Sequence, residues 1–359
     1  MIWDDVIRDI ERGMVGRNTG IPLGFNKLSE YVPGLQQGTY YLIAAESSVG
    51  KSAFADELFL FRAYDFIVSE YNPGLKLKVI YYSLEIDKRI KITKAICRRL
   101  YLQYGILTDV NYILSRGRNR VSDEVYEKVV ETKKYFEGLE DILDIYDANI
   151  NPTGIHKQLW EYCEKNGKLD VVEHRTTYTP NNPNLYTFAI VDHAGLVKRE
   201  QGLDNKGNMD KLSQYMVPLR NICKISPVII QQLNRSISST DRIKLELMTP
   251  QLSDLKGSGN LGEDANIVFA LFSPFRYDMP SYKKYNIEML RDRYRCLSLI
   301  KNRDGESDKS LGLNFIGEIG YFRELPRGDE MSPEDYERAV SYKKIQQKEH
   351  LFTNLKFDE

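Results

Sequence analysis

The sequence lacks long hydrophobic runs: no stretch approaches the roughly 18 apolar residues that a membrane-spanning helix requires. The first residues, MIWDDVIRDIE, are acidic and do not form the pattern of a signal peptide. Cysteine is scarce, with 4 in 359 residues, and no two are spaced as in a CxxC pair. The 4 histidines also lack the spacing of metal ligands. We therefore expect a cytoplasmic protein with reduced, mostly buried cysteines and no membrane partner.

An excess of either charge sign is also missing, since the formal net charge is -1. Hydrophobic residues make up 42% and charged residues 28% of the chain, which is ordinary for a globular protein with a sizeable core. A small DNA-binding domain usually carries surplus Lys and Arg. Any nucleic-acid site must therefore be a local patch, such as the lining of a channel, and the net charge neither supports nor excludes one.

Apolar strand-like segments alternate with helical ones from residue 39 onward. β-branched and aromatic runs without strict polar alternation are typical of strands that are covered on both faces. Strands separated by helices indicate an α/β fold with a mostly parallel central sheet, and residues 311–325 predict a terminal antiparallel hairpin. The expected strands span residues 39–45, 78–84, 186–192, 226–232, 266–272 and 295–301.

Three segments lie outside this alternating core. Residues 3–14 predict a helix with one apolar stripe, which either packs on its own domain or docks on a neighbouring subunit. Residues 105–165 are expected to be mainly helical, and residues 168–185 to form an inserted hairpin or loop. The charged tail, 327–359, contains a helix start at Ser332. We expect a linker helix in 1–20 and one large domain over 21–326.

The segment AESSVGKS, between a predicted strand and a predicted helix, fits a phosphate-binding loop. Loop N–H groups and the helix amino terminus would face phosphate oxygens. Gly50 permits a close backbone approach, Lys51 supplies a charge for the outer phosphates and Ser52 a hydroxyl for Mg²⁺. These features predict ATP with Mg²⁺ as cofactors. The expected nucleotide-binding residues are Ala45, Ser47, Ser48, Val49, Gly50, Lys51, Ser52 and Ala53.

Two carboxylates end predicted strands near this loop. Asp192 is placed to hold a magnesium ion, although an Asp at a strand end is commonly a loop cap. Glu85 is a candidate general base for the attacking water. Its position alone favours the other interpretation, an acidic residue stabilised at a helix amino terminus.

Together these residues resemble the DnaB-type replicative helicases, from about Gly20 to about Leu325. Ala at the leading loop position is usual in that family. YYSLE resembles its SLE motif, which implies that Glu85 is the base. FAIVDHAGLV resembles its Mg²⁺ strand, with His193 where Tyr is more usual, and IIQQLNR resembles its SQLNR segment. Gln232 would then sense the γ-phosphate.

Two further segments extend the resemblance. LSDLKGSGNLGEDAN is similar to the family's DNA-contacting segment, so Lys256, Gly257 and Gly259 would lie along the nucleic-acid backbone, with Arg235 nearby. IKNRDG is similar to the KxRxG strand end that reaches a neighbour's nucleotide. The resemblance therefore implies trans-acting Arg303 and Lys301. It also implies a RecA-like core and a homo-oligomeric ring, a hexamer, that translocates on single-stranded DNA and unwinds duplex.

The sequence departs from the family in several places. Gly257 and Gly262 replace acidic residues, and the 168–185 insertion has no counterpart. A separate amino-terminal helical domain has no counterpart either, which puts in doubt the implied contacts with primase or a helicase loader. For Arg235 and the basic stretch 242–244, a solvated loop is an equal alternative.

Three competing functions stay open at this stage. A RecA-type recombinase shares the fold and the trans-acting finger but exchanges DNA strands. A DNA-binding accessory ATPase would unwind poorly, and a signalling ATPase of the same fold would bind no nucleic acid. Unwinding of a forked duplex, strand pairing and DNA-stimulated ATP turnover distinguish these possibilities.

Overall fold

A computed structural model describes residues 2–16, 18–172, 175–234, 237, 242, 248–257 and 259–341. Its centre is a nine-stranded sheet in the order β13-β12-β11-β8-β1-β7-β6-β2-β3. From β8 to β3 all neighbouring strands run parallel, and β11, β12 and β13 are antiparallel. The strands are β1 (Tyr41–Ala45), β2 (Lys76–Ser83), β3 (Leu143–Tyr146), β6 (Leu185–Asp192), β7 (Ser226–Gln232), β8 (Ile267–Phe272), β11 (Tyr294–Asn302), β12 (Lys309–Ile316) and β13 (Tyr321–Glu324).

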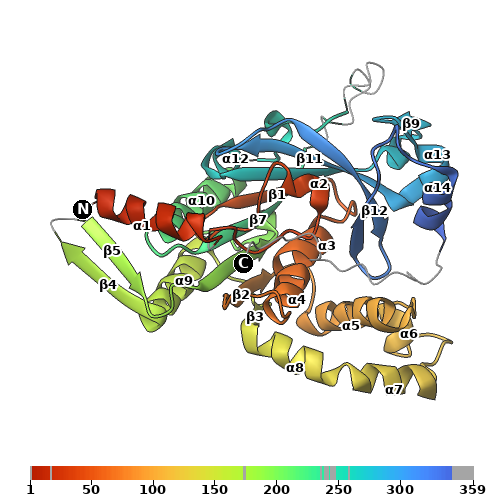
Figure 1. Ribbon diagram of the computed structural model, residues 1–359, viewed down its shortest axis with the longest axis horizontal. Helices are drawn as coiled ribbons and strands as arrows, with labels where there is room; N and C mark the ends of the chain where they lie inside the picture. Colours follow the sequence, from red (N-terminus) through yellow and green to blue (C-terminus); the bar gives the residue numbers. More distant parts are fainter. Residues whose placement is uncertain are drawn as a thin grey trace.

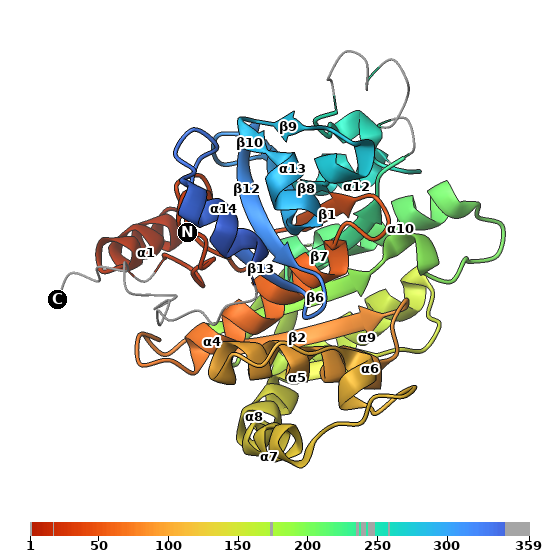
Figure 2. The same ribbon diagram turned by 90° about the vertical axis from the view of Figure 1, so that its right-hand side faces the viewer.

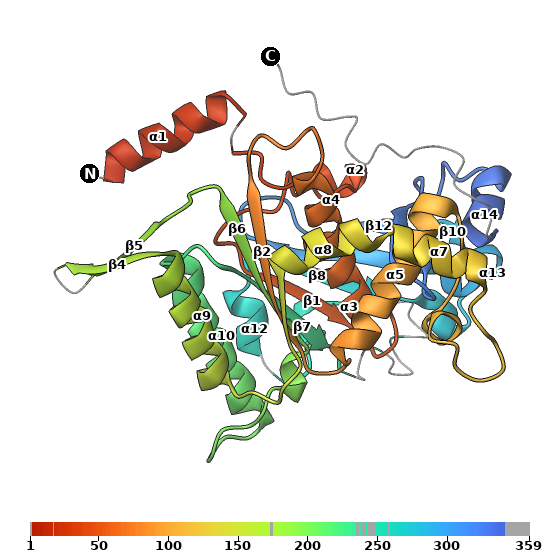
Figure 3. The same cartoon turned by 90° about the horizontal axis from the view of Figure 1, so that it is seen from below.

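Helices cover both faces of this sheet (Figure 3). One face carries α3 (Lys51–Ala55), the π-helical η1 (Asp56–Arg62), α4 (Ala63–Ile67), α5 (Lys88–Tyr104), α7 (Asp123–Glu131) and α8 (Lys133–Ile142). The other face carries α9 (Pro152–Asn166), α10 (Asn205–Asn221) and α12 (Gly259–Asp264). Short elements complete the fold: α2 (Asn26–Ser29), α6 (Val110–Ile113), η2 (Ala194–Leu196), η4 (Leu252–Asp254), η5 (Pro274–Tyr277), α13 (Ile287–Leu290), η6 (Arg291–Arg293) and the β9–β10 pair (Ser281–Tyr282, Tyr285–Asn286).

The central strand β1 shows why continuous apolar runs form this sheet. Tyr41 and Ile43 are buried in the core on the α3 side, and Leu42 and Ala44 are buried in the core on the α10 side. Successive side chains of a strand point to opposite faces, so a strand covered on both faces has no position for a polar residue. The predicted α/β fold with a mostly parallel sheet is confirmed.

A buried ionic cluster stabilises the first layer of helices. Glu57 of η1 is fully buried and accepts hydrogen bonds from Arg62 Nε at 2.8 Å and Arg98 Nε at 2.7 Å. Arg62 also donates to the carbonyl of Phe322 at 2.8 Å. Because buried charges need partners, this cluster joins α5 and β13 to the helix that follows the phosphate loop.

Two elements project from the sheet edge at which the parallel strands begin (Figures 1 and 3). The helix α1 (Ile2–Met14) stands apart from the body, and Trp3 and Met14 on it are 68% and 81% exposed. The insertion forms an antiparallel hairpin of β4 (Gly167–Val172) and β5 (Arg175–Pro180), as predicted. Helix α14 (Pro333–Val340) begins after Ser332, whose side chain accepts a hydrogen bond from Asp335 N, and it lies beside β12 (Figure 2).

One strand was missed by the sequence analysis, which treated 105–165 as mainly helical. β3 has only four residues, LDIY, and pairs with β2 at the sheet edge. Its length and alternating polar residue are too short a signal to separate from the helices around it. All four cysteines are free and buried, as expected. Among the described residues, no helix combines the length and apolar character needed to cross a bilayer.

Candidate functional site

The phosphate loop joins β1 to α3 and is held in place by side chains from neighbouring elements. Tyr277 Oη donates to Glu46 Oε2 at 2.6 Å, and Arg276 Nη1 donates to the carbonyl of Ser47 at 2.6 Å. The buried Arg295 of β11 donates through Nε to the carbonyl of Val49 at 2.7 Å. The loop is therefore preorganised by contacts that leave its backbone N–H groups out of these bonds.

Gly50 is required at the end of this loop. Its φ of 111° lies in the left-handed region, which side chains with a Cβ rarely adopt. A Cβ atom at this position would lie 3.1 Å from ring carbons of both Phe315 and Phe322. Glycine thus lets the loop pass closely over these two rings before α3 begins at Lys51.

Ser52 and Asp192 meet at the carboxyl ends of β1 and β6. Ser52 Oγ donates to Asp192 Oδ1 at 2.9 Å, and Tyr81 Oη donates to Asp192 Oδ2 at 3.1 Å. Asp192 is fully buried. Burial raises the pKa of Tyr81 well above its usual value, and the charges of Asp192 and Asp56 raise it further. The phenol therefore keeps its proton and acts as the donor.

These oxygen donors fit magnesium. Mg²⁺ binds through one or two carboxylates together with substrate phosphates, and a hydroxyl and a carboxylate here lie beside a phosphate loop. In the part of the chain that the structure describes, no group of three His, Cys, Asp or Glu residues is arranged to hold a metal on its own. A metal at Ser52 and Asp192 would thus depend on the nucleotide.

Glu85 and His193 lie at the open side of the phosphate site. Glu85 Oε2 is 3.7 Å from Lys51 Nζ, and Glu85 is about half-exposed whereas Lys51 is buried. Burial lowers the pKa of His193, and the neighbouring Lys51 charge lowers it further. His193 Nδ1 accepts a hydrogen bond from Gly195 N at 3.2 Å. A neutral imidazole and a carboxylate therefore face the same space as the loop lysine.

Gln232 connects the phosphate loop to the Lys256 segment. Its Nε2 donates to Ser47 Oγ at 2.7 Å, and its carbonyl accepts a hydrogen bond from Lys256 N at 3.0 Å. The side chain of Gln231 donates to the carbonyl of Lys256. Lys256 itself is exposed. A shift of Ser47 would therefore pass through one residue to the exposed lysine.

The remaining predicted DNA-contacting residues lie partly within this segment. Gly257 has a φ of 88°, and a Cβ there would lie 2.5 Å from Met209 Cε. Gly259 begins α12. Arg235 lies outside the described residues, as does 243–244. Arg242 is not a solvated side chain, because it forms an ion pair with the buried Asp254 and donates to the carbonyl of Thr249 at 2.9 Å.

Arg303 and Lys301 lie at the opposite edge of the sheet from the phosphate loop. Asn302 pairs with Ile267, the first residue of β8, whereas Ala45 pairs with Leu271 near its end. Four residues of strand, about 13 Å, separate these two positions. The chain then leaves the sheet in opposite directions at the two ends. Arg303 is therefore too far from the phosphate loop of its own subunit to reach a bound nucleotide.

Both cations rest on the carboxyl-terminal end of α12. Lys301 Nζ donates to the carbonyls of Gly262 at 2.9 Å and Glu263 at 2.6 Å, and Arg303 Nη2 donates to Glu263 O at 3.2 Å. Burial lowers the pKa of Lys301, and the charge of Arg303 lowers it further. Lys301 thus supports the strand end, while the exposed Arg303 is held by one long hydrogen bond.

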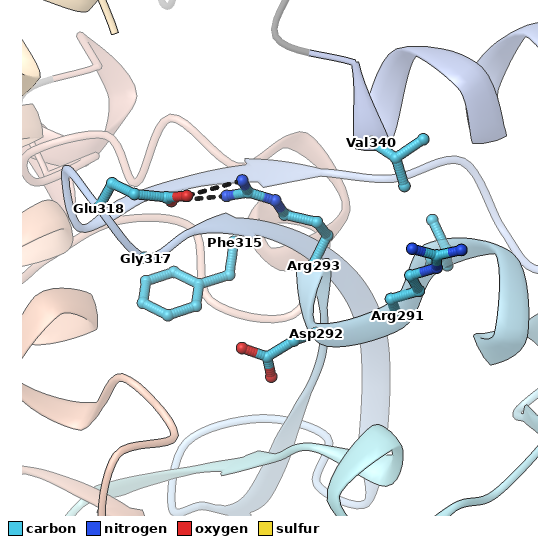
Figure 4. A pocket seen from close by; sticks show the side chains of 8 residues that line it. Arg291, Asp292, Arg293, Phe315, Gly317, Glu318 and Val340 are labelled. Atoms are coloured by element: carbon cyan, nitrogen blue, oxygen red, sulfur yellow. Dashed lines mark hydrogen bonds and ion pairs between the residues drawn. The ribbon is translucent and has the colours of Figure 1, made fainter. Parts of the chain in front are cut away.

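A pocket of about 510 Å³ lies next to the phosphate loop (Figure 4). Phe315 lines it and also lies against Gly50. Arg293 and Glu318 form a two-point ion pair across its wall at 2.7 and 2.8 Å. Val340, from α14, closes one side. The volume is in the range of small-ligand pockets.

The sequence analysis missed the residues that hold the site from outside. Tyr81 lies two positions before Ser83, the register partner of Asp192, so the strand alternation indicates that it shares the face of Asp192. Arg295 stands at the start of an otherwise apolar run, and such a charge in a central strand is a signal that it has a buried partner. Nothing in the sequence indicates the contacts of Arg276 and Tyr277.

Comparisons with known proteins agree with this geometry. A family model described as "DnaB-like helicase C terminal domain" matches residues 20–324. Replicative DNA helicase DnaB of Geobacillus stearothermophilus is 22% identical over 316 residues, covering 87% of this chain and 58% of the relative. Replicative DNA helicase DnaB of Helicobacter pylori (strain ATCC 700392 / 26695) is 24% identical over 277 residues, covering 77% and 48%. The chain spans about half the length of the curated relatives it matches.

Two solved structures share the fold. One is the structure of an isolated ATPase domain, with a TM-score of 0.67, 22% identity, and coverage of 90% of this chain and 98% of that chain. The other is described as "The Structure Of A DnaB-Like Replicative Helicase And Its Interactions With Primase", with a TM-score of 0.65, 22% identity, and coverage of 90% and 67%. At this identity the likeness establishes the RecA-like fold alone.

Proposed function

This chain belongs to the DnaB-like helicase C terminal domain family, and we propose that it is the motor of an ATP-dependent replicative DNA helicase. The proposal is a homo-oligomeric ring, a hexamer, that moves on single-stranded DNA and unwinds duplex. The motor spans residues 21–326 and works in the cytoplasm. We include primase or a helicase loader among the proposed partners, because a related helicase was solved with its interactions with primase.

One observation carries the proposal: the phosphate loop and Arg303 lie at opposite edges of one sheet. Asn302 and Ala45 bond to opposite ends of β8, so a single subunit cannot bring Arg303 to its own nucleotide. In a ring, one subunit would present its phosphate loop to the Arg303 edge of the next. Each active centre would then be shared between two copies.

The residues around the loop support the chemistry of ATP hydrolysis. Lys51 and the loop N–H groups would bind the phosphates, and Ser52 with Asp192 would hold Mg²⁺, which supplies charge neutralisation on the phosphate oxygens. Glu85, within 3.7 Å of Lys51, would orient the attacking water and take its proton. Arg303 of the next subunit would stabilise the charge that develops on the transferred phosphoryl group.

The link from Ser47 through Gln232 to Lys256 supports coupling between nucleotide and DNA. Gln232 contacts the loop by its side chain and Lys256 by its backbone. We assign phosphate contacts on single-stranded DNA to Lys256, Gly257, Gly259 and Arg235. Such contacts release counterions, so DNA affinity should fall steeply with salt.

The pocket beside the loop is proposed to receive the base and sugar of the nucleotide. Phe315 offers an aromatic wall, and the pocket borders Gly50 directly. Val340→Arg would crowd this pocket without touching the loop, so it should weaken ADP binding but not the binding of tripolyphosphate. Equal weakening of both ligands would count against this assignment.

The helix α1 is proposed to be a linker that docks on the adjacent subunit. Its apolar residues Trp3, Ile10 and Met14 are exposed on the single chain. Burying each large apolar side chain contributes about 1.5–3 kcal/mol. A second copy of this chain is the proposed occupant of this surface.

Mixing two inactive variants tests the shared site. Lys51→Ala removes the phosphate-loop cation and Arg303→Ala removes the finger, so each should lose DNA-stimulated ATP hydrolysis alone. In a one-to-one mixed ring, about a quarter of the interfaces would combine an intact loop with an intact finger. Recovery of roughly that fraction of turnover supports the proposal. No recovery in rings shown to contain both variants would refute a shared site.

The same assay separates the competing functions. Turnover that single-stranded DNA does not change would indicate a signalling ATPase. DNA-stimulated turnover without unwinding of a forked duplex would indicate an accessory ATPase, and pairing of homologous strands would indicate a recombinase.

A further inference from the structure

Tyr81 is a buried polar residue that the mechanism above does not use. It lies on β2 and is fully buried, and its hydroxyl donates to Asp192 Oδ2 at 3.1 Å. The other oxygen of Asp192 accepts from Ser52 at 2.9 Å. Two donors on two different elements thus fix both oxygens of one carboxylate. A carboxylate bonded in this way has one orientation.

The ring of Tyr81 is itself held in place. Lys91 Nζ lies 3.8 Å from the centre of this ring, and it forms an ion pair with Asp56 at 2.8 Å. Lys91 is buried, as is Tyr81. A desolvated cation over an aromatic face is an attractive contact of about 2 kcal/mol. The phenol is therefore clamped between α5 and the sheet, with its hydroxyl aimed at Asp192.

We propose that Tyr81 is a positioning residue for the magnesium ion, acting through Asp192. The proposal rests on the nucleotide site described above. Partners that orient a metal-binding carboxylate commonly change metal affinity by about 10- to 100-fold when they are removed. Ser52 cannot replace Tyr81 in this role, because its hydroxyl would be engaged by the metal itself. Tyr81 is then the donor that keeps Asp192 oriented while the metal is bound.

The neighbouring Tyr82 offers a matched control. It is also buried, but it belongs to the core on the other face of the sheet. Its hydroxyl has no hydrogen-bond partner in the structure. Tyr81→Phe and Tyr82→Phe therefore remove the same atom from adjacent positions of one strand, and only the first touches Asp192.

The test measures metal binding directly, on the full chain in complex with ADP. Mn²⁺ serves as the probe, and its binding is followed by the loss of the free-ion electron paramagnetic resonance signal. We expect Tyr81→Phe to bind Mn²⁺ at least about 10-fold more weakly, with ADP affinity in metal-free buffer unchanged. Tyr82→Phe should match the wild type in both measurements. Wild-type Mn²⁺ affinity in Tyr81→Phe would overturn the proposal.

Two further outcomes keep the proposal falsifiable. If Tyr81→Phe does not fold, Lys91→Gln loosens the clamp without touching Asp192 and should lower Mn²⁺ affinity in the same direction; unchanged affinity would refute the clamp. A wild-type protein that binds ADP in neither condition would refute the nucleotide site itself. That result is distinguishable from failure of the Tyr81 role alone.

Discussion

Replacing Arg303 by alanine should abolish ATP turnover while leaving the subunit folded and able to bind nucleotide. Arg303 makes one hydrogen bond to Glu263 O at 3.2 Å and is exposed. Its loss should therefore lower the free energy of unfolding by less than about 1 kcal/mol. Because the nucleotide of its own subunit lies beyond the far end of β8, ADP affinity should change by less than about twofold.

The loss of turnover should be large, since an arginine finger accounts for about 10³–10⁵ in rate. The assay is DNA-stimulated phosphate release at saturating ATP, with ADP binding measured by calorimetry on the same preparation. Lys309→Ala is the control, because Lys309 is a cation at the same edge of the sheet and pairs with Glu306 at 2.6 Å. It should retain full turnover. An Arg303→Ala protein that loses ADP binding, or that hydrolyses ATP at the normal rate, would refute the reasoning.

Three more perturbations test other parts of the structure. Glu57→Gln should lower the free energy of unfolding by about 3–5 kcal/mol, because it leaves two buried arginines without their carboxylate; urea titration measures this, and the exposed pair at Glu137 should tolerate the same change. Gly50→Ala forces a left-handed conformation that costs about 1–2 kcal/mol and places a methyl against two rings, so ADP binding should weaken, whereas Gly202→Ala, with open space around it, should not affect binding. Deleting residues 1–18 should convert rings to monomers in light scattering, and a stable ring after the deletion would contradict docking by α1.

Local patterns in the sequence were sufficient to predict the layered α/β core and the phosphate loop. Apolar runs such as 226–232 become strands because both faces of the sheet are covered, and the loop follows β1 because its residues suit no other conformation. The helix start at Ser332 also depends only on nearby residues. Such features need no knowledge of distant parts of the chain.

The tertiary structure alone decided which distant groups meet. Tyr81 and Ser52 are far apart along the chain from Asp192, and only strand order brings both to its carboxylate. The support of the phosphate loop by Arg295 likewise depends on β11 running antiparallel beside β8. A short edge strand such as β3 forms because β2 is there to pair with it. Contacts of this kind arise from the packing of the whole chain, since local sequence determines the conformation of a segment but not its neighbours.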